Sequence, residues 1–210
     1  MSRESFLQNV RAALGRGADP PFAPPPAPRL VVQDMDLETR MARFASALEA
    51  LGGSFHRVSS PEEACACVGA IIAGKSCVAS NAPYLKECGI TGLPGVQTGF
   101  TDEPELRRLC AVADFGITSA SYALADTGTL VMLSSGGEAR MISLVPPAHV
   151  AVLPKERFLT GLDELFTVLP RPAEDTSSMV LITGPSRTAD IEQILIRGVH
   201  GPGEIHVVVV

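Results

Sequence analysis

Apolar residues recur at helical spacing in several stretches of the chain, with polar residues on the opposite side. The N-terminal stretch has the pattern of a short amphipathic helix, and the next stretch stops at Gly52 and Gly53. Ser60 and Glu63 are the residue pair of a capping box, which opens a third helix. Helices are therefore predicted at residues 2–14, 36–51, 61–72, 101–110, 155–169 and 188–196.

Short runs of consecutive apolar residues lie between the predicted helices. Such runs are typical of strands that are buried on both faces of a sheet. A turn near Asp126–Gly128 separates two of them. Because helices and strands alternate, we expect an α/β sheet with helices on both faces. Strands are predicted at residues 54–58, 77–80, 177–183 and 204–210, with several more between 115 and 154.

The segment that follows the first helix is rich in proline, with six prolines between Pro20 and Pro28. Proline removes backbone donors and favours extended conformations, so this segment is predicted to be a tether. No second core is separately bounded in the rest of the chain. We therefore divide the chain into an N-terminal helix with a Pro-rich linker, residues 1–29, and a single α/β domain, residues 30–210.

Composition and charge exclude several classes of protein. Apolar residues make up 46% of the 210-residue chain, which is enough for a substantial core. The formal net charge of -6 provides no basic field for a phosphate backbone, so nucleic acid is not expected as a partner. No apolar run reaches the roughly 20 residues that span a bilayer. The N-terminus lacks the features of a secretory signal, so we expect a cytoplasmic protein.

The five cysteines do not form a recognisable cofactor or disulfide pattern. Their number is odd, and no C-x-x-C occurs among them. Clustered thiolates of that kind are what hold an iron–sulfur cluster or a structural zinc ion. We expect reduced and mostly buried thiols, with no metal site and no cofactor in this chain.

Polar groups are concentrated near the end of the chain, in TGPSRTADIEQILIRGVHGPGE, residues 183–204. There an apolar strand leads through a turn into a predicted helix, whose N-terminus would offer free N–H groups to an anion. Gly184 would let the backbone come close to a ligand, and Arg187 would add a bidentate grip. The alternative is that Thr188 only caps the helix. The candidate ligand-binding residues here are Gly184, Ser186, Arg187, Thr188 and Asp190.

Two other segments supply further candidates. His200 is flanked by glycines in a loop and is a candidate proton donor or acceptor, because imidazole is the side chain best suited to proton transfer near neutrality. A histidine in such a loop is also typical of a hydrogen-bonded structural residue. A tight turn at Asp126 is followed by a glycine-containing loop that ends at Arg140, where a long cation could fold over a ligand. The catalytic candidates are His200 and Asp126, and the added ligand-binding candidates are Thr127, Gly128, Thr129, Arg140 and His200.

Three segments, in the same order, resemble the lactate utilisation protein C family, also called LutC or YkgG, whose domain is the LUD domain. They are GITSASYALADTGTLV, ARMISLVPPAHVAVLP and GPSRTADIEQILIRGVHGPGEIHV, and the resemblance runs from about Glu103 to the C-terminus. In the turn motif this chain has Asp126 where the family has Glu, so the carboxylate is kept but is one methylene shorter.

The resemblance implies a fold similar to the NagB/RpiA/CoA-transferase group. It also implies a role in the oxidation of L-lactate to pyruvate, together with lactate-utilisation proteins A and B, which carry the iron–sulfur centres. No catalytic residues come with the family, so the candidate residues rest on local chemistry alone.

Three hypotheses follow. The first is a cofactor-free component of a lactate-oxidising system that binds a small carboxylate or phosphate-type ligand. The second is a transferase or ligase that uses CoA or a nucleotide, which the implied fold would allow. The third is an assembly module without a ligand, whose N-terminal segment recruits the iron–sulfur partners.

Overall fold

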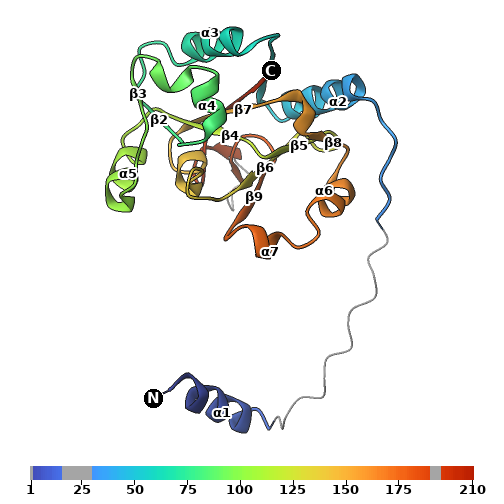
Figure 1. The fold of residues 1–210 in the computed structure, drawn as a ribbon, viewed down its shortest axis with the longest axis vertical. Coiled ribbons are helices and arrows are strands. Elements are labelled where there is room, and N and C mark those ends of the chain that lie inside the picture. The colour runs from blue at the N-terminus through green and yellow to red at the C-terminus, as the bar shows by residue number, and fades with distance from the viewer. Residues whose placement is uncertain (1, 16–29, 190–194) are drawn as a thin grey trace.

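A six-stranded parallel sheet forms the centre of the molecule (Figure 1). The computed structural model describes residues 2–15, 30–189 and 195–210. Within the sheet the last strand of the chain, β12, lies between the first strand and β7. In spatial order the strands are β1 (Ser54–Arg57), β12 (Glu204–Val209), β7 (Ala148–Leu153), β4 (Phe115–Ser119), β2 (Cys77–Ala79) and β3 (Val96–Gln97).

Both faces of this sheet are buried, as the continuous apolar runs predict. In β7, Val150 and Val152 join the cluster under helices α3 (Pro61–Ile71) and α4 (Pro83–Glu87). Ala151 and Leu153 point to the opposite face, where helix α2 (Leu37–Ala50) packs through Met41, Phe44 and Leu48. The prediction of an α/β fold with helices on both faces is confirmed.

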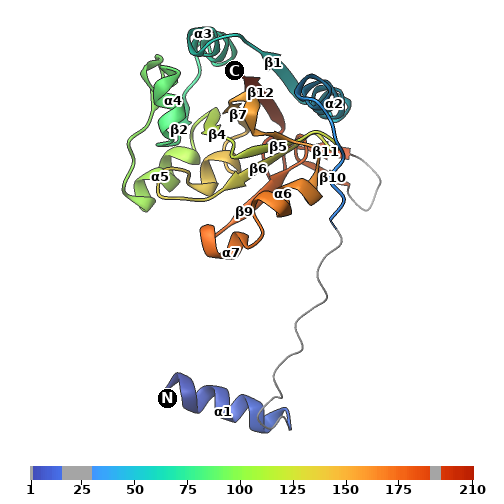
Figure 2. The same ribbon diagram turned by 45° about the vertical axis from the view of Figure 1, so that its right-hand side comes forward.

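A second, four-stranded sheet packs on the α2 side of the central sheet (Figure 2). Helix α6 (Leu162–Val168) contributes Leu165 to an apolar cluster with side chains of this sheet. The turn predicted near Asp126–Gly128 joins two of its strands, and Gly128 has a φ of 65°. Its strands, in order, are β8 (Phe158–Leu159), β5 (Tyr122–Leu124), β6 (Thr129–Leu133) and β9 (Met179–Ile182).

Helix α1 (Arg3–Ala13) confirms the predicted N-terminal helix; it buries none of its residues and lies away from the sheets in both views (Figures 1 and 2). None of the helices in the described ranges is long and apolar enough to cross a membrane. The other elements are helices α5 (Glu103–Cys110) and α7 (Pro172–Asp175), the short 3-10 turns η1 (Ile90–Gly92), η2 (Arg140–Ser143) and η3 (Lys155–Arg157), and strands β10 (Arg187–Ala189) and β11 (Leu195–Arg197).

Two predicted helices are wrong. At 155–169 the helical periodicity is interrupted, because Phe158 and Leu159 pair with β5 as strand β8, and α6 begins only after Gly161. At 188–196, strand β10 pairs with β11 in antiparallel register. This stretch is rich in β-branched residues, whose strand preference outweighs an apparent helical period. Residues 190–194 lie outside the described residues.

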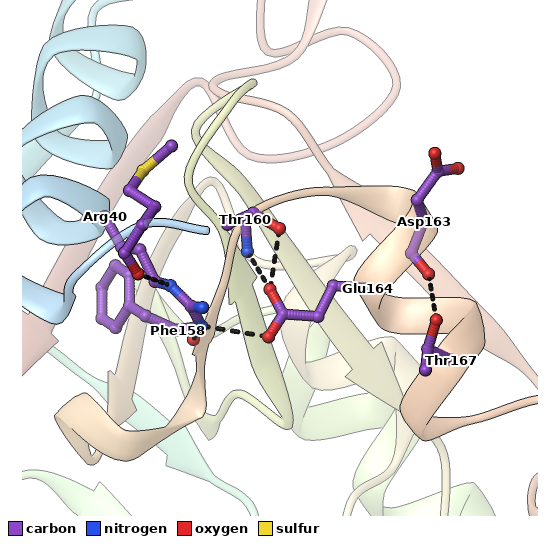
Figure 3. Close-up of polar contacts among 7 residues, drawn as sticks. Arg40, Phe158, Thr160, Asp163, Glu164 and Thr167 are labelled. Carbon is purple, nitrogen blue, oxygen red and sulfur yellow. Dashed lines mark hydrogen bonds and ion pairs between the residues drawn. The ribbon is translucent and has the colours of Figure 1, made fainter. Parts of the chain in front are cut away.

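A polar cluster joins α2 to the second sheet and to α6 (Figure 3). The Arg40 guanidinium donates to the Phe158 carbonyl at 2.9 Å and lies 3.1 Å from the Glu164 carboxylate. The same carboxylate accepts from the amide and the hydroxyl of Thr160, at 2.6 and 2.7 Å. Burial acts to raise the pKa of Glu164, but these donors and Arg40 outweigh it, and the pKa is lowered. The Glu164 carboxylate is therefore charged, and both of its oxygens accept hydrogen bonds.

Candidate functional site

A pocket of about 450 Å³ opens at the carboxyl ends of the parallel strands β2, β4 and β7. This is the edge at which open α/β sheets bind their ligands. Ser119 ends β4, and Pro154 follows β7 directly. The pocket is lined by Ala82, Tyr84, Ser119, Ala120, Ser121, Tyr122, Leu133, Ser134, Ser135, Glu138, Pro154, Arg157 and Asp175.

Glu138 is the buried carboxyl group of this pocket, with only 8% of the residue exposed. It is carried by the loop that follows β6, where the Ser135 hydroxyl accepts from the Glu138 amide at 3.1 Å. Its Oε2 accepts from the Ser80 hydroxyl at 2.9 Å, and its Oε1 from the Ser119 amide at 3.3 Å. Ser80 directly follows β2, and Ser119 is the last residue of β4. The loop thus places the carboxyl group over the ends of two neighbouring strands.

Burial raises the pKa of Glu138 to about 7, although the hydrogen bonds from Ser80 and Ser119 act in the opposite direction. Removal of a carboxylate from water disfavours its charged form, and two donors do not replace a full hydration shell. Glu138 therefore changes its charge near neutrality, which is the property of a group that donates or accepts protons at physiological pH.

The mouth of the pocket holds two opposite charges. Arg157 follows β7 in η3 and is exposed, and its guanidinium lies 5.6 Å from the centre of the Tyr122 ring. Within the described ranges Arg157 forms no ion pair with a carboxylate. Asp175 lies exposed on the same lining. The stacked guanidinium offers a planar, oriented contact for the carboxylate of a ligand.

The two turns that the sequence predicts to form a ligand site do lie together. Thr127 Oγ1 donates to Asp126 Oδ1 at 3.1 Å and lies 2.7 Å from Thr129 Oγ1. Thr129 Oγ1 in turn lies 2.8 Å from Thr183 Oγ1, just after β9. A row of hydroxyl groups therefore links the turn between β5 and β6 to the end of β9.

The glycines and the arginine of this region contact the C-terminal end of α2. A Cβ atom at Gly128 would lie 2.6 Å from the Leu48 nitrogen, and one at Gly184 would lie 2.8 Å from the Leu51 Cβ. Arg187 donates to the Leu51 carbonyl, at the helix end where a cation is favourable. The group that comes close to Gly128 and Gly184 is therefore helix α2 of this chain.

The remaining candidates are spread over the surface. The Gly198 amide donates to the Ser186 carbonyl at 3.0 Å, so the loop with the exposed His200 runs beside Ser186. Arg140 lies in η2, 3.5 Å from the Ser178 hydroxyl just before β9, whereas Arg187 follows the other end of β9. The structure does not bring the two arginines together. Thr188 lies in β10, and Asp190 lies outside the described residues.

The other histidines make local contacts. His149, in β7, is fully buried; its Nε2 lies 2.7 Å from the Thr118 hydroxyl, and its Nδ1 has no partner. Burial lowers the pKa of His149 to about 4, so the ring is neutral. His206 lies between His56 at 3.2 Å and Glu204 at 2.7 Å. Across residues 2–15, 30–189 and 195–210, no group of three or more His, Cys, Asp or Glu side chains is placed to hold a metal ion.

Sequence reasoning missed Glu138, Arg157 and the serines around them. It applied the rule of strand carboxyl ends to β9, which belongs to the second sheet and not to the parallel one. A usable signal was present, because Ser80 and Ser119 are polar residues directly at the ends of two predicted apolar strands. A carboxylate in the serine- and glycine-containing loop SSGGE is the natural acceptor for such donors.

The chain is similar to a known domain family and to named bacterial proteins. Residues 41–210 match the family model described as LUD domain. "Lactate utilization protein C" of Halalkalibacterium halodurans is 32% identical, over 95% of this chain and 94% of the relative. The protein of the same name from Shouchella clausii is 28% identical over 96% and 94%.

A solved structure has the same fold. It is the crystal structure of a DUF162 family protein from Deinococcus radiodurans, with a TM-score of 0.64 and 19% sequence identity, covering 84% of this chain and 99% of that one. At this identity the likeness concerns the fold alone. The family match over most of the chain, together with the relatives that align along nearly their whole length, leads to one conclusion: this chain belongs to the LUD domain family of lactate utilization C proteins.

Proposed function

We propose that this protein is a component of a lactate-utilisation system and that it binds a small carboxylate, L-lactate or pyruvate, in the Glu138 pocket. The names of its relatives support the pathway. The ligand rests on one observation: a buried carboxyl group and an exposed, stacked guanidinium line the same pocket at the carboxyl ends of the parallel strands.

The proposed pose gives each polar end of the ligand a partner. The carboxylate pairs with Arg157, which can hold it with two parallel hydrogen bonds. The oxygen on the neighbouring carbon then lies toward Glu138, with the hydroxyl groups of Ser119 and Ser121 as further partners in the lining. The polar cluster at Arg187 is the competing location, since it was the site predicted from the sequence.

In this proposal the chain acts with lactate-utilisation proteins A and B, as the family resemblance implies. The iron–sulfur centres that take up electrons lie on those partners, and this chain contributes ligand binding without a cofactor of its own. The cytoplasmic location stays a prediction, as does the boundary at residue 30 between the linker and the domain.

Calorimetric titration with L-lactate, pyruvate, phosphate, CoA and common nucleotides tests this function. We expect the wild type to bind the two small acids and Arg157→Gln to lose about tenfold or more in affinity, because a charge-assisted hydrogen bond is lost. Arg108→Gln is the control, since Arg108 is an exposed arginine of α5 that does not line the pocket.

The other outcomes separate the hypotheses. Loss of binding in Arg187→Gln but not in Arg157→Gln would place the ligand at the turn after β9. Binding of CoA or a nucleotide, with neither small acid bound, would favour the transferase hypothesis. Failure of every compound to bind, together with capture of proteins A and B by the intact chain, would favour the assembly module.

A further inference from the structure

Glu138 is placed so that its protonation state decides what it can bind. An ionised carboxylate has about four acceptor sites. Two of them are taken by the Ser80 hydroxyl at 2.9 Å and the Ser119 amide at 3.3 Å, and Glu138 also lines the pocket. In the ionised form the remaining sites can only accept a hydrogen bond. In the protonated form the group can donate one.

Lactate and pyruvate differ in this respect. The 2-hydroxyl group of lactate can donate to a carboxylate or accept from a protonated carboxyl group, whereas the 2-oxo group of pyruvate can only accept. A buried carboxylate facing a carbonyl oxygen would leave two acceptors in contact, which is costly because neither is satisfied. The hydroxy acid therefore suits either form of the glutamate, whereas the oxo acid suits only the protonated form.

The other titratable groups of the pocket do not replace Glu138 in this role. Tyr84 of α4 has its pKa raised by burial, so its phenol stays neutral. Arg157 has no acceptor and is matched to the ligand's carboxylate. Asp175 of α7 is exposed to water at the mouth. Glu138 is the buried carboxyl group of the lining, held by neutral donors on the strand ends.

On the basis of the proposed function, we propose that Glu138 is the residue by which the pocket distinguishes a 2-hydroxy acid from the corresponding 2-oxo acid. The hydroxy acid binds with the carboxyl group in either state, and the oxo acid binds only with it protonated. Where the carboxyl group of the free pocket is ionised, the oxo acid therefore takes up a proton from the solvent on binding, whereas the hydroxy acid exchanges none. No bond of the ligand is broken in this step.

The test measures the dissociation constants of L-lactate and pyruvate across the neutral range, by ligand-observed NMR and by calorimetry in two buffers of different ionisation enthalpy. Because burial raises the pKa of Glu138 to about 7, the two acids should differ across this range, and lactate should bind with about the same affinity at about pH 6 and about pH 8 with no proton exchange. Pyruvate should take up about one proton at about pH 8, with affinity falling about tenfold per pH unit above the pKa.

The variant Glu138→Gln should bind both ligands with no proton exchange and with flat pH profiles, while Glu174→Gln, a neighbouring exposed carboxylate paired with Arg171, should behave as the wild type. Ser80→Ala is the second variant. It removes a donor that lowers the pKa of Glu138, so the pH profile of pyruvate should shift upward.

The outcomes are distinct. If neither acid binds the wild type, the proposed function fails and this inference fails with it. If both acids bind but their affinities follow pH in parallel, without proton exchange, the inference is overturned while the proposed function stands. Unfolding of Glu138→Gln leaves the decision to Ser80→Ala, for which an unshifted pyruvate profile would also overturn the inference.

Discussion

At the scale of single residues, two buried side chains respond to pH in opposite directions. Glu138 has its pKa raised from 4.5 to about 7, and His149 has its pKa lowered from 6.5 to about 4. A carboxyl group whose pKa is raised by folding stabilises the folded state in acid, and this stabilisation is lost as the pH rises through the pKa of the folded state. Stability from a lowered histidine pKa is present at neutral pH and is lost in acid. The two effects oppose each other between about pH 4 and 7.

Glu138→Gln should therefore change how stability depends on pH. Relative to the wild type, the variant should gain stability as the pH rises from about 5 to about 8, by roughly 3 kcal/mol at most, because the cost of ionising a buried carboxyl group is absent. With that term removed, the acid destabilisation due to His149 should become visible. Urea denaturation at several pH values measures the free energy of unfolding.

The matched control for this measurement is Glu174→Gln, on an exposed residue of α7. Its curve should run parallel to that of the wild type, because an exposed carboxylate has little to gain from losing its charge. Parallel curves for Glu138→Gln as well would show that the buried carboxyl group does not titrate as inferred.

At the scale of elements, the Arg40 cluster is the polar joint between α2, β8 and α6 (Figure 3). Arg40→Met should lower the free energy of unfolding by about 2 kcal/mol, since it leaves a partly buried carboxylate and a carbonyl without their cation. Arg107→Met is the control, because its ion pair with Glu103 is exposed within α5 and should be worth less than about 0.5 kcal/mol. Equal losses in thermal or urea denaturation would contradict the role of the joint.

The elements show where sequence patterns suffice. The apolar runs at β4, at β7 and in the second half of β12 have no amphipathic alternation, so they could be recognised as strands of a buried sheet. The predicted helix start at Ser60 and Glu63 is also confirmed, since the Ser60 hydroxyl accepts from the Glu63 amide at 3.3 Å. The hairpin of β10 and β11 was not predictable in this way, because cross-strand pairing depends on contacts that local periodicity does not contain.

The candidate site was predictable in part, for a similar reason. The turn at Asp126 and the turn after β9 both supplied candidate residues from the sequence, and Thr129 of the first turn contacts Thr183 of the second. The packing of these turns against α2 could not be predicted, because the close approach of Gly128 and Gly184 to that helix is a tertiary contact. The pKa of Glu138 was equally hidden, since only burial in the folded chain raises it.

At the scale of the whole molecule, the N-terminal segment is separate from the part that matches the family model, which begins at residue 41. Removal of residues 1–29 should leave the melting temperature unchanged within about 2 °C, because α1 buries none of its residues. Differential scanning calorimetry of the shortened and the full chain measures this. A drop of several degrees would show that the segment packs on the domain and would move the boundary from residue 30.

The order of strands in the central sheet has a consequence for how the protein is made. Strand β12 is the last in the chain, yet it lies between β1 and β7 with both faces buried. During synthesis, β1 can pair with its neighbour only after β12 has emerged from the ribosome. The nascent chain therefore exposes the unpaired edges of β1 and β7 until β12 is available, which makes chaperone binding at that stage a physical expectation of the topology.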